Sequence, residues 1–221
     1  MAAILFGSIS TLVDTSELQR KAFNKSFAAH DLHWNWSRED YRSMLGSNGG
    51  AQRIADYARD RGDDVDADTV HATKSEIFQE LLRTAELDAR PGVVATIEEA
   101  KRTDHKLGFV TTTSRANIDA ILDALKPHIS AKMFDLIVNS DSVQKPKPDP
   151  AAYSFALEQL GEDPAHAVAI EDNIGGVAAA SAAGVRCIAF PNENTVGGDF
   201  SAAAETVETL DAARVLGLAT A

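Results

Sequence analysis

Residues 167–190 read AVAIEDNIGGVAAASAAGVRCIAF. Two short apolar runs, 167–170 and 186–190, flank an alanine-rich stretch that ends at Gly184. Apolar runs of this length are typical of strands buried on both faces of a parallel sheet, and glycine commonly ends a helix. This segment therefore predicts a strand, a helix and a second strand parallel to the first.

Earlier parts of the chain repeat the pattern. Similar apolar runs stand at residues 3–6, 107–110 and 134–138. Ser114 is placed to cap a helix over residues 115–125, and Asp149 followed by Pro150 is placed to start one over residues 151–160. Strands that alternate with helices predict a doubly wound α/β core around a parallel sheet.

The long interval between the first two apolar runs breaks this alternation. It shows no convincing strand pattern, and its apolar residues recur at helical spacing, as at Val70, Ile77 and Leu81. The turn sequence at residues 90–92 marks the return to the core. We therefore expect a core of residues 1–14 and 90–221, and an inserted helical cap of residues 15–89.

Composition narrows the class of partner and the compartment. The chain has 221 residues, a formal net charge of −12 and no cluster of lysine and arginine, which argues against nucleic acid as a partner. Its single cysteine, Cys187, cannot form an intrachain disulfide and lies in an apolar run, so we expect a buried thiol and a reducing compartment. Residues 2–13 lack the basic start of a signal peptide, and no other segment has the apolar length of a membrane span. We expect a cytoplasmic protein with no membrane partner.

Four segments follow the ends of the predicted strands, where open α/β sheets bind their ligands. They are residues 7–15, 111–114, 145–150 and 171–173. Taken singly, each has a plain structural interpretation, as a helix cap, a solvated loop or an acidic strand end. Together they offer hydroxyls, a lysine and an acidic pair, which are the groups that hold a phosphoryl group and a divalent cation.

Two of these segments carry a resemblance to a known family. Residues 145–150, KPKPDP, and residues 171–184, EDNIGGVAAASAAG, resemble the third and fourth motifs of the haloacid dehalogenase superfamily. The resemblance extends over essentially the whole chain and is to the branch with a helical cap, which includes phosphoglycolate phosphatase and β-phosphoglucomutase. It implies a phosphohydrolase scaffold.

The resemblance also implies roles for particular residues. Thr111, with Thr112 beside it, would bind phosphate, and Lys145 would balance negative charge. Glu171 and Asp172 would serve a magnesium ion. The ligand would be a small phosphorylated metabolite or an inorganic anion.

The first motif departs from the family pattern. Gly7 stands where the family has its aspartate nucleophile, and Ile9 stands where it has an acid/base aspartate. Glycine has no side chain and isoleucine cannot transfer a proton, so both catalytic groups are missing. Because side chains alternate along an extended strand end, positions 7 and 9 should face the site while Ser8 points away.

Losing the nucleophile also removes a magnesium ligand. The remaining magnesium ligands would be Asp172, Glu171, the backbone carbonyl of Ile9 and water, so we expect weak magnesium binding. Our hypothesis is that an ion pair between Lys145 and the acidic pair replaces much of the structural role of the metal.

Four functions are compatible with these residues. The first is a scaffold that has lost turnover but keeps an anion pocket, and the second is a magnesium-dependent hydrolase that uses a displaced nucleophile or a water activated by Glu171 or Asp172. The third is a 2-haloacid dehalogenase, and the fourth is a structural protein that acts through its cap. The retained phosphate-binding and acidic residues favour the scaffold with an anion pocket over the purely structural protein. The missing carboxylates favour it over the two enzymes, since the dehalogenase needs the same aspartate.

Several cap residues invite a functional interpretation. Trp34 and Trp36 could line a pocket, but we interpret them as core or hinge packing of the cap. The glycine-rich residues 46–50 look like the loop that the family presents to its substrate, and they fit a plain turn equally well. None of the six histidines pairs at metal-ligand spacing with a nearby acid, so we assign them to the surface or to packing.

Overall fold

The computed structural model describes residues 2–46 and 49–220. Its centre is a six-stranded sheet in the order β3-β2-β1-β4-β5-β6, and every pairing in it is parallel. The strands are β1 (Ala3–Phe6), β2 (Lys106–Val110), β3 (Leu136–Val138), β4 (Ala167–Glu171), β5 (Arg186–Ala189) and β6 (Glu205–Thr206). The predicted parallel sheet is confirmed. Only the two-residue β6 was not predicted, because so short a strand has no periodicity to detect.

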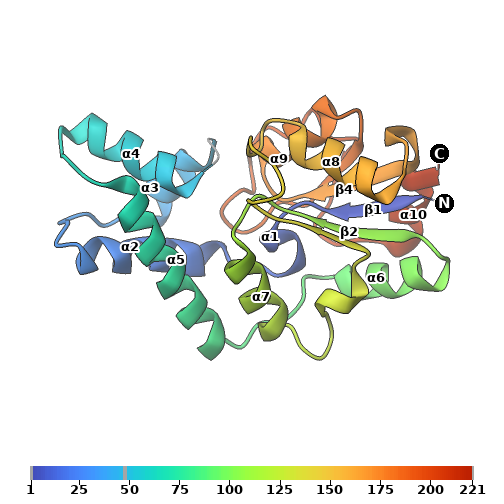
Figure 1. The fold of residues 1–221 in the computed structure, drawn as a ribbon, viewed down its shortest axis with the longest axis horizontal. Helices are drawn as coiled ribbons and strands as arrows, with labels where there is room; N and C mark the ends of the chain where they lie inside the picture. Colours follow the sequence, from blue (N-terminus) through green and yellow to red (C-terminus); the bar gives the residue numbers. More distant parts are fainter. Residues whose placement is uncertain (1, 47–48, 221) are drawn as a thin grey trace.

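Helices cover both faces of this sheet (Figure 1). One face packs against α6 (Val93–Arg102), α7 (Arg115–Ala124) and α10 (Ala212–Thr220), and the other against α8 (Ala151–Leu160) and α9 (Ile174–Ala182). Ile4 and Phe6 of β1 lie in the first layer, and Ala3 and Leu5 in the second, as strand alternation requires. The core is therefore doubly wound, as predicted.

Four longer helices follow β1 and the one-turn α1 (Ile9–Leu12) and lie beside the core (Figure 1). They are α2 (Ser16–Ala29), α3 (Arg38–Ser43), α4 (Gly50–Arg61) and α5 (Ala67–Thr84), and we call them the cap. Short 3-10 helices occur at Met44–Gly46, Ala131–Met133 and Pro164–His166. The described part of the chain has no helix that is long and apolar enough to cross a membrane.

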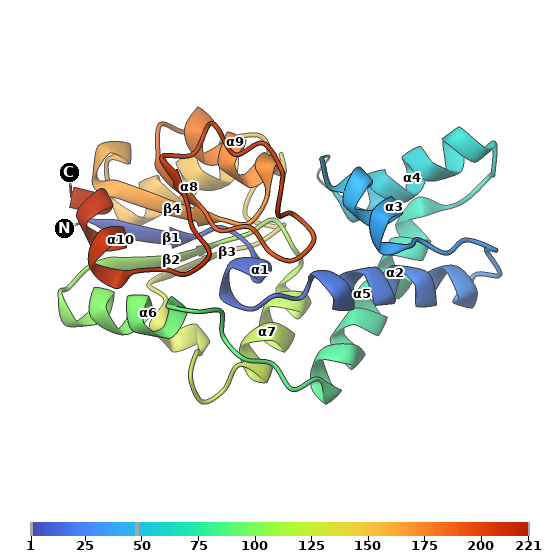
Figure 2. The same cartoon turned by 180° about the vertical axis from the view of Figure 1, so that it is seen from behind.

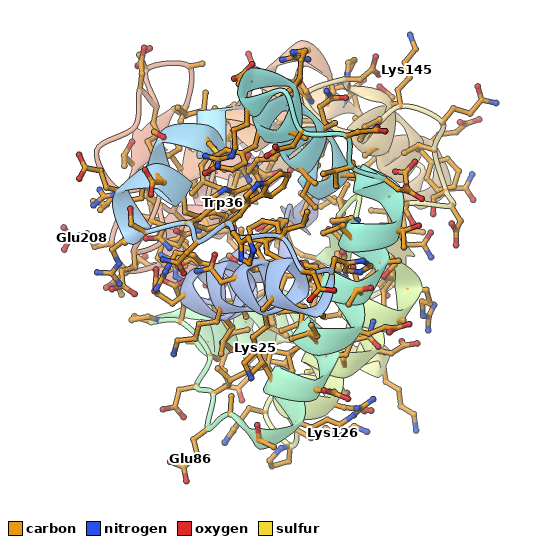
Figure 3. All side chains as sticks on the ribbon, turned by 90° about the vertical axis from the view of Figure 1, so that its left-hand side faces the viewer. Lys25, Trp36, Glu86, Lys126, Lys145 and Glu208 are labelled. Carbon is orange, nitrogen blue, oxygen red and sulfur yellow. The ribbon has the colours of Figure 1, made fainter. Side chains whose placement is uncertain are left out.

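The cap has its own apolar core. Trp36 is completely buried among aromatic rings, with its ring centroid 4.8 Å from Phe23 and 4.6 Å from Phe27, and Trp34 is buried beside it. Figure 3 shows Trp36 within the cap. Their interpretation as cap packing is confirmed.

Helix α5 belongs to both apolar cores. Its Val70 packs in the cap, whereas Phe78 and Leu82 are buried in the main core. At the same end, Gln79 Nε2 donates to Asn117 Oδ1 of α7 over 3.0 Å. The α5–α7 contact therefore connects the cap to the core.

The carboxyl ends of the strands face the cap (Figure 2). Two helices begin at this edge with side-chain caps: Ser114 Oγ accepts from the Asn117 amide before α7, and Asn173 Oδ1 accepts from the Gly176 amide before α9. The predicted cap at Ser114 is confirmed. Both caps direct a helix N-terminus, the positive end of its dipole, toward this edge of the sheet.

Candidate functional site

A cavity of about 430 Å³ lies between the cap and the carboxyl edge of the sheet. Its walls come from elements far apart in the sequence. From the core they include Ser8, Ile9, Thr111, Thr112, Asp172 and Asn192, and from the cap Gln19, Phe23, Tyr41, Arg53, His71 and Lys74. The expectation that ligands bind at the carboxyl ends of the strands therefore predicted the place of the cavity, but it identified only the residues on the core side.

Hydroxyl groups form the wall at the start of α7. Thr111 is buried and its Oγ1 accepts from the Thr113 amide over 3.3 Å, while Thr113 Oγ1 accepts from Asn117 Nδ2 over 3.0 Å. Thr111, Thr112 and Ser114 also line the cavity. Hydroxyls beside the unpaired amides of a helix N-terminus make a suitable environment for an anion.

Asp172 is the carboxylate that reaches the cavity from the end of β4. Its Oδ1 accepts from Ser8 Oγ over 2.6 Å and from Asn173 Nδ2 over 2.9 Å, and its Oδ2 accepts from Asn192 Nδ2 over 2.5 Å. The prediction that Ser8 points away is wrong. β1 ends at Phe6, and Ser8, although its backbone is still extended, is the N-cap of α1, where the chain turns into a helix, so the alternation of the strand does not carry over to it.

The lysine of the predicted ion pair also needs correction. The Lys145 side chain is 75% exposed and projects outward, with its Nζ 3.7 Å from Asp149 Oδ2 (Figure 3). The buried pair is formed by Lys147, whose Nζ lies 2.5 Å from Glu171 Oε1. Two lysines separated by one proline have the same local pattern, so only the tertiary fold determines which of them turns inward.

Lys147 and Glu171 lie beneath the cavity and do not line it. Lys147 Nζ also donates to the carbonyls of Gly7 and Val110, over 2.5 and 2.7 Å, and Tyr153 donates its hydroxyl to Glu171 Oε1 over 2.7 Å. Burial raises the pKa of the Glu171 carboxyl, and Lys147 opposes that rise. Burial, with Glu171 next in size, also raises the pKa of the Tyr153 hydroxyl.

The residues present do not fit a magnesium ion. Gly7 contributes no side chain, Glu171 is paired beneath the cavity, and both oxygens of Asp172 already accept hydrogen bonds. Within residues 2–46 and 49–220, no group of three or more His, Cys, Asp or Glu side chains is placed to hold a metal. Magnesium in proteins is held by one or two carboxylates together with water and phosphate, and here the one carboxylate at the cavity, Asp172, already has both oxygens hydrogen-bonded to protein donors.

Sequence patterns missed the cationic side chains on the cap side. Arg53 of α4 and Lys74 of α5 are buried, and the Lys74 Nζ donates to Gln19 Oε1. Burial, with Arg53 adding, lowers the pKa of Lys74 to about 7. Burial and the adjacent Lys74 lower the pKa of His71 to about 4. These residues come together only when α4 and α5 pack, so no local motif marks them.

Two further expectations concern the cap loop and the cysteine. Ser47 and Asn48, in the middle of the glycine-rich loop, lie outside the described residues, while Gly49 and Gly50 line the cavity. Cys187 is buried, as expected, and burial raises the pKa of its thiol.

The family model of haloacid dehalogenase-like hydrolases matches residues 6–190, from the end of β1 to the end of β5. The chain belongs to this family. Protein CbbY of Rhodobacter capsulatus is 38% identical to it over 216 residues, which cover 96% of this chain and 95% of that protein.

Solved structures of the family agree with the fold. The crystal structure of CbbY from Rhodobacter sphaeroides in complex with phosphate has a TM-score of 0.88 and 39% identity, over 95% of each chain. An aspartate-to-asparagine mutant of that protein in complex with xylulose-1,5-bisphosphate matches equally well. A putative β-phosphoglucomutase from Thermotoga maritima has a TM-score of 0.69 and 25% identity, over 99% of this chain and 98% of that one. The helical-cap branch inferred from the motifs is confirmed.

Proposed function

We propose that this member of the haloacid dehalogenase-like family binds a sugar carrying two phosphate groups and does not hydrolyse it. One observation carries the proposal: the cavity has a hydroxyl wall and a cationic wall, but Gly7 and Ile9 stand where the family has its catalytic carboxylates. A site built this way can hold anions, but it lacks the groups that break a phosphate ester.

The core wall suits the first phosphate. Thr111, Thr112 and Ser114 lie together at the start of α7, where hydroxyls and backbone amides can donate to phosphoryl oxygens. Asp172 is the acid on this wall, and its oxygens are already hydrogen-bonded by Ser8, Asn173 and Asn192. The dipoles of these neutral donors partly screen the carboxylate and so reduce its repulsion of an anion.

The cap wall suits the second phosphate. Lys74 has no acidic partner among the described residues, and the charged Arg53 lies on the same wall. Holding an ammonium group in a buried position is costly unless an anion compensates it. A second phosphate at this wall would supply that anion, and it would lie across the cavity from the first.

The relatives support the same class of ligand. The structures of CbbY from Rhodobacter sphaeroides contain phosphate in one case and xylulose-1,5-bisphosphate in the other. Their similarity over 95% of this chain supports a phosphorylated sugar here. A ligand with two phosphates also matches a cavity with two anion-binding walls.

The first prediction tests both parts of the proposal. In isothermal titration calorimetry, we expect xylulose-1,5-bisphosphate to bind more tightly than xylulose 5-phosphate, by about tenfold to a hundredfold, because only the bisphosphate reaches both walls. In a parallel assay with magnesium, neither compound should release phosphate above the background. Lys74→Met should remove most of the preference for the bisphosphate, whereas the exposed Lys145→Met should leave it unchanged.

Two results would contradict the proposal. Equal affinity for the two compounds in the natural protein would mean that the cap wall does not bind phosphate. Phosphate release that increases with enzyme concentration would mean that the chain is a working hydrolase.

One contact favours such a hydrolase as the second candidate. Ser8 Oγ donates to Asp172 Oδ1 over 2.6 Å at the cavity wall, which is the arrangement of a hydroxyl beside a carboxylate base. Glu171 is excluded from this role by its burial beneath the cavity and its pairing with Lys147. Turnover abolished equally by Ser8→Ala and Asp172→Asn would establish this candidate.

A further inference from the structure

The Glu171 carboxylate occupies the space beside two glycines. A Cβ atom added at Gly7 would lie 2.2 Å from Glu171 Oε1 and 2.4 Å from the Tyr153 hydroxyl oxygen. A Cβ atom added at Gly176 would lie 2.1 Å from the Glu171 carboxyl carbon. Real Cβ atoms essentially never approach other heavy atoms so closely. The position that a side chain at residue 7 would take is therefore filled by the Glu171 carboxylate together with the Tyr153 hydroxyl.

The charge beneath the cavity is balanced without any added ion. Lys147 is 6% exposed and Glu171 is fully buried, so one positive and one negative charge face each other away from solvent. The three protons of the Lys147 ammonium group have three close acceptors, namely Glu171 Oε1 and the carbonyls of Gly7 and Val110. The second Glu171 oxygen, Oε2, is buried without a partner on the Gly176 side.

We propose that the Glu171 carboxylate has taken the place of the carboxylate that the family has at position 7, after β1, and that its pair with Lys147 makes the anion site independent of magnesium. Gly7 leaves this space free of a side chain of its own, the Glu171 carboxylate occupies it, and Lys147 neutralises the charge of that carboxylate. Asp172 is then the single carboxylate at the cavity from the core strand ends, so an incoming phosphate meets less negative charge than two carboxylates would present. This inference deepens the proposed function, because it takes the cavity to be an anion site.

The direct test uses inorganic phosphate as the probe. In calorimetry, we expect the affinity for phosphate to be the same with a chelator and with excess magnesium, and we expect manganese titrated into the protein to give no binding heat. Magnesium that raises the affinity by about tenfold, or manganese that binds, would overturn the inference. If phosphate binds under neither condition, the proposed function fails, and the manganese titration still decides the inference by itself.

A second test examines the contact between Gly7 and Glu171. Gly7→Ala should lower the urea midpoint of the natural protein, because the new methyl group displaces the Glu171 carboxylate from Lys147. In a Lys147→Met/Glu171→Ala background, where neither charge is present and only the contact with the Tyr153 hydroxyl remains, Gly7→Ala should have a clearly smaller effect, so the changes are not additive. Gly217→Ala is the matched control, since a Cβ there meets nothing within 4 Å.

The comparison of Gly7→Ala in the two backgrounds gives a clear result even if this variant folds poorly. Folding that Gly7→Ala abolishes and the double background restores would support the inference. Equal midpoint shifts by Gly7→Ala in both backgrounds would overturn it, because the methyl group would then be acting on something other than Glu171.

Discussion

Lys147→Met is expected to lower the free energy of unfolding by about 3–5 kcal/mol, the usual cost of leaving one member of a buried ion pair uncompensated. The substitution keeps most of the apolar side-chain volume, so the loss reports the charge and its three shortest hydrogen bonds. Urea unfolding followed by circular dichroism measures it. Lys145→Met is the matched control, two residues away on an exposed side chain, and should change the free energy by less than about 0.5 kcal/mol.

A compensating variant separates charge from packing. In Lys147→Met/Glu171→Leu both charges are removed, so most of the lost stability should return. Similar losses for Lys147→Met and Lys145→Met would show that the buried pair described here does not form in solution.

The affinity for the bisphosphate is expected to fall as the pH rises above 7, by up to about tenfold per pH unit. Lys74 is responsible: its pKa is lowered to about 7, so the free protein loses this charge near neutrality. A bound phosphate favours the ammonium form and raises that pKa, so binding takes up a proton. The affinity therefore decreases between the pKa of the free protein and the higher pKa of the complex.

The groups around Lys74 do not obscure this dependence. Arg53 of α4 stays charged, His71 has a pKa lowered to about 4 and is neutral throughout, and Gln19 and Phe23 of α2 carry no charge. Across the cavity, Asp172 is the acidic group of the core wall. The second pKa of a phosphate monoester is about 6, so its titration is largely complete at pH 7, and changes in affinity from pH 7 to 9 report mainly on the protein.

Lys74→Met supplies the control for the pH dependence. This variant should bind the bisphosphate weakly, with an affinity that hardly changes from pH 7 to 9. A natural protein whose affinity is flat over the same range would show that Lys74 does not contact the ligand.

The sheet and its helices could be predicted because the central strands β1, β2, β4 and β5 are largely buried on both faces, so each of them carries its own apolar run. The cavity could be predicted for the related reason that parallel strands end at one edge, which brought Thr111, Thr112 and Asp172 together. The Ser114 cap followed from its position immediately before a helical pattern. Each of these features can be recognised from short stretches of sequence, with the parallel sheet bringing the strand ends to one edge.

The remaining features depend on packing between distant segments. Lys145 and Lys147 share one local pattern, and burial against Glu171 alone distinguishes them. Arg53 and Lys74 form one wall because two cap helices meet, and neither helix indicates this by itself. Ser8 was misplaced because β1 ends at Phe6 and α1 begins at Ile9, whereas the prediction extended strand alternation to residue 9.

The helix α5 has a consequence for how ligands are selected. It carries Lys74 in the cap, and its Gln79 is hydrogen-bonded to Asn117 of α7, the helix whose start carries the hydroxyl wall. The two anion-binding walls are therefore connected through the contact between α5 and α7, which sets their separation in this structure. We expect the cavity to select ligands by length: it should bind two phosphates at one separation more tightly than longer or shorter sugar bisphosphates of the same charge.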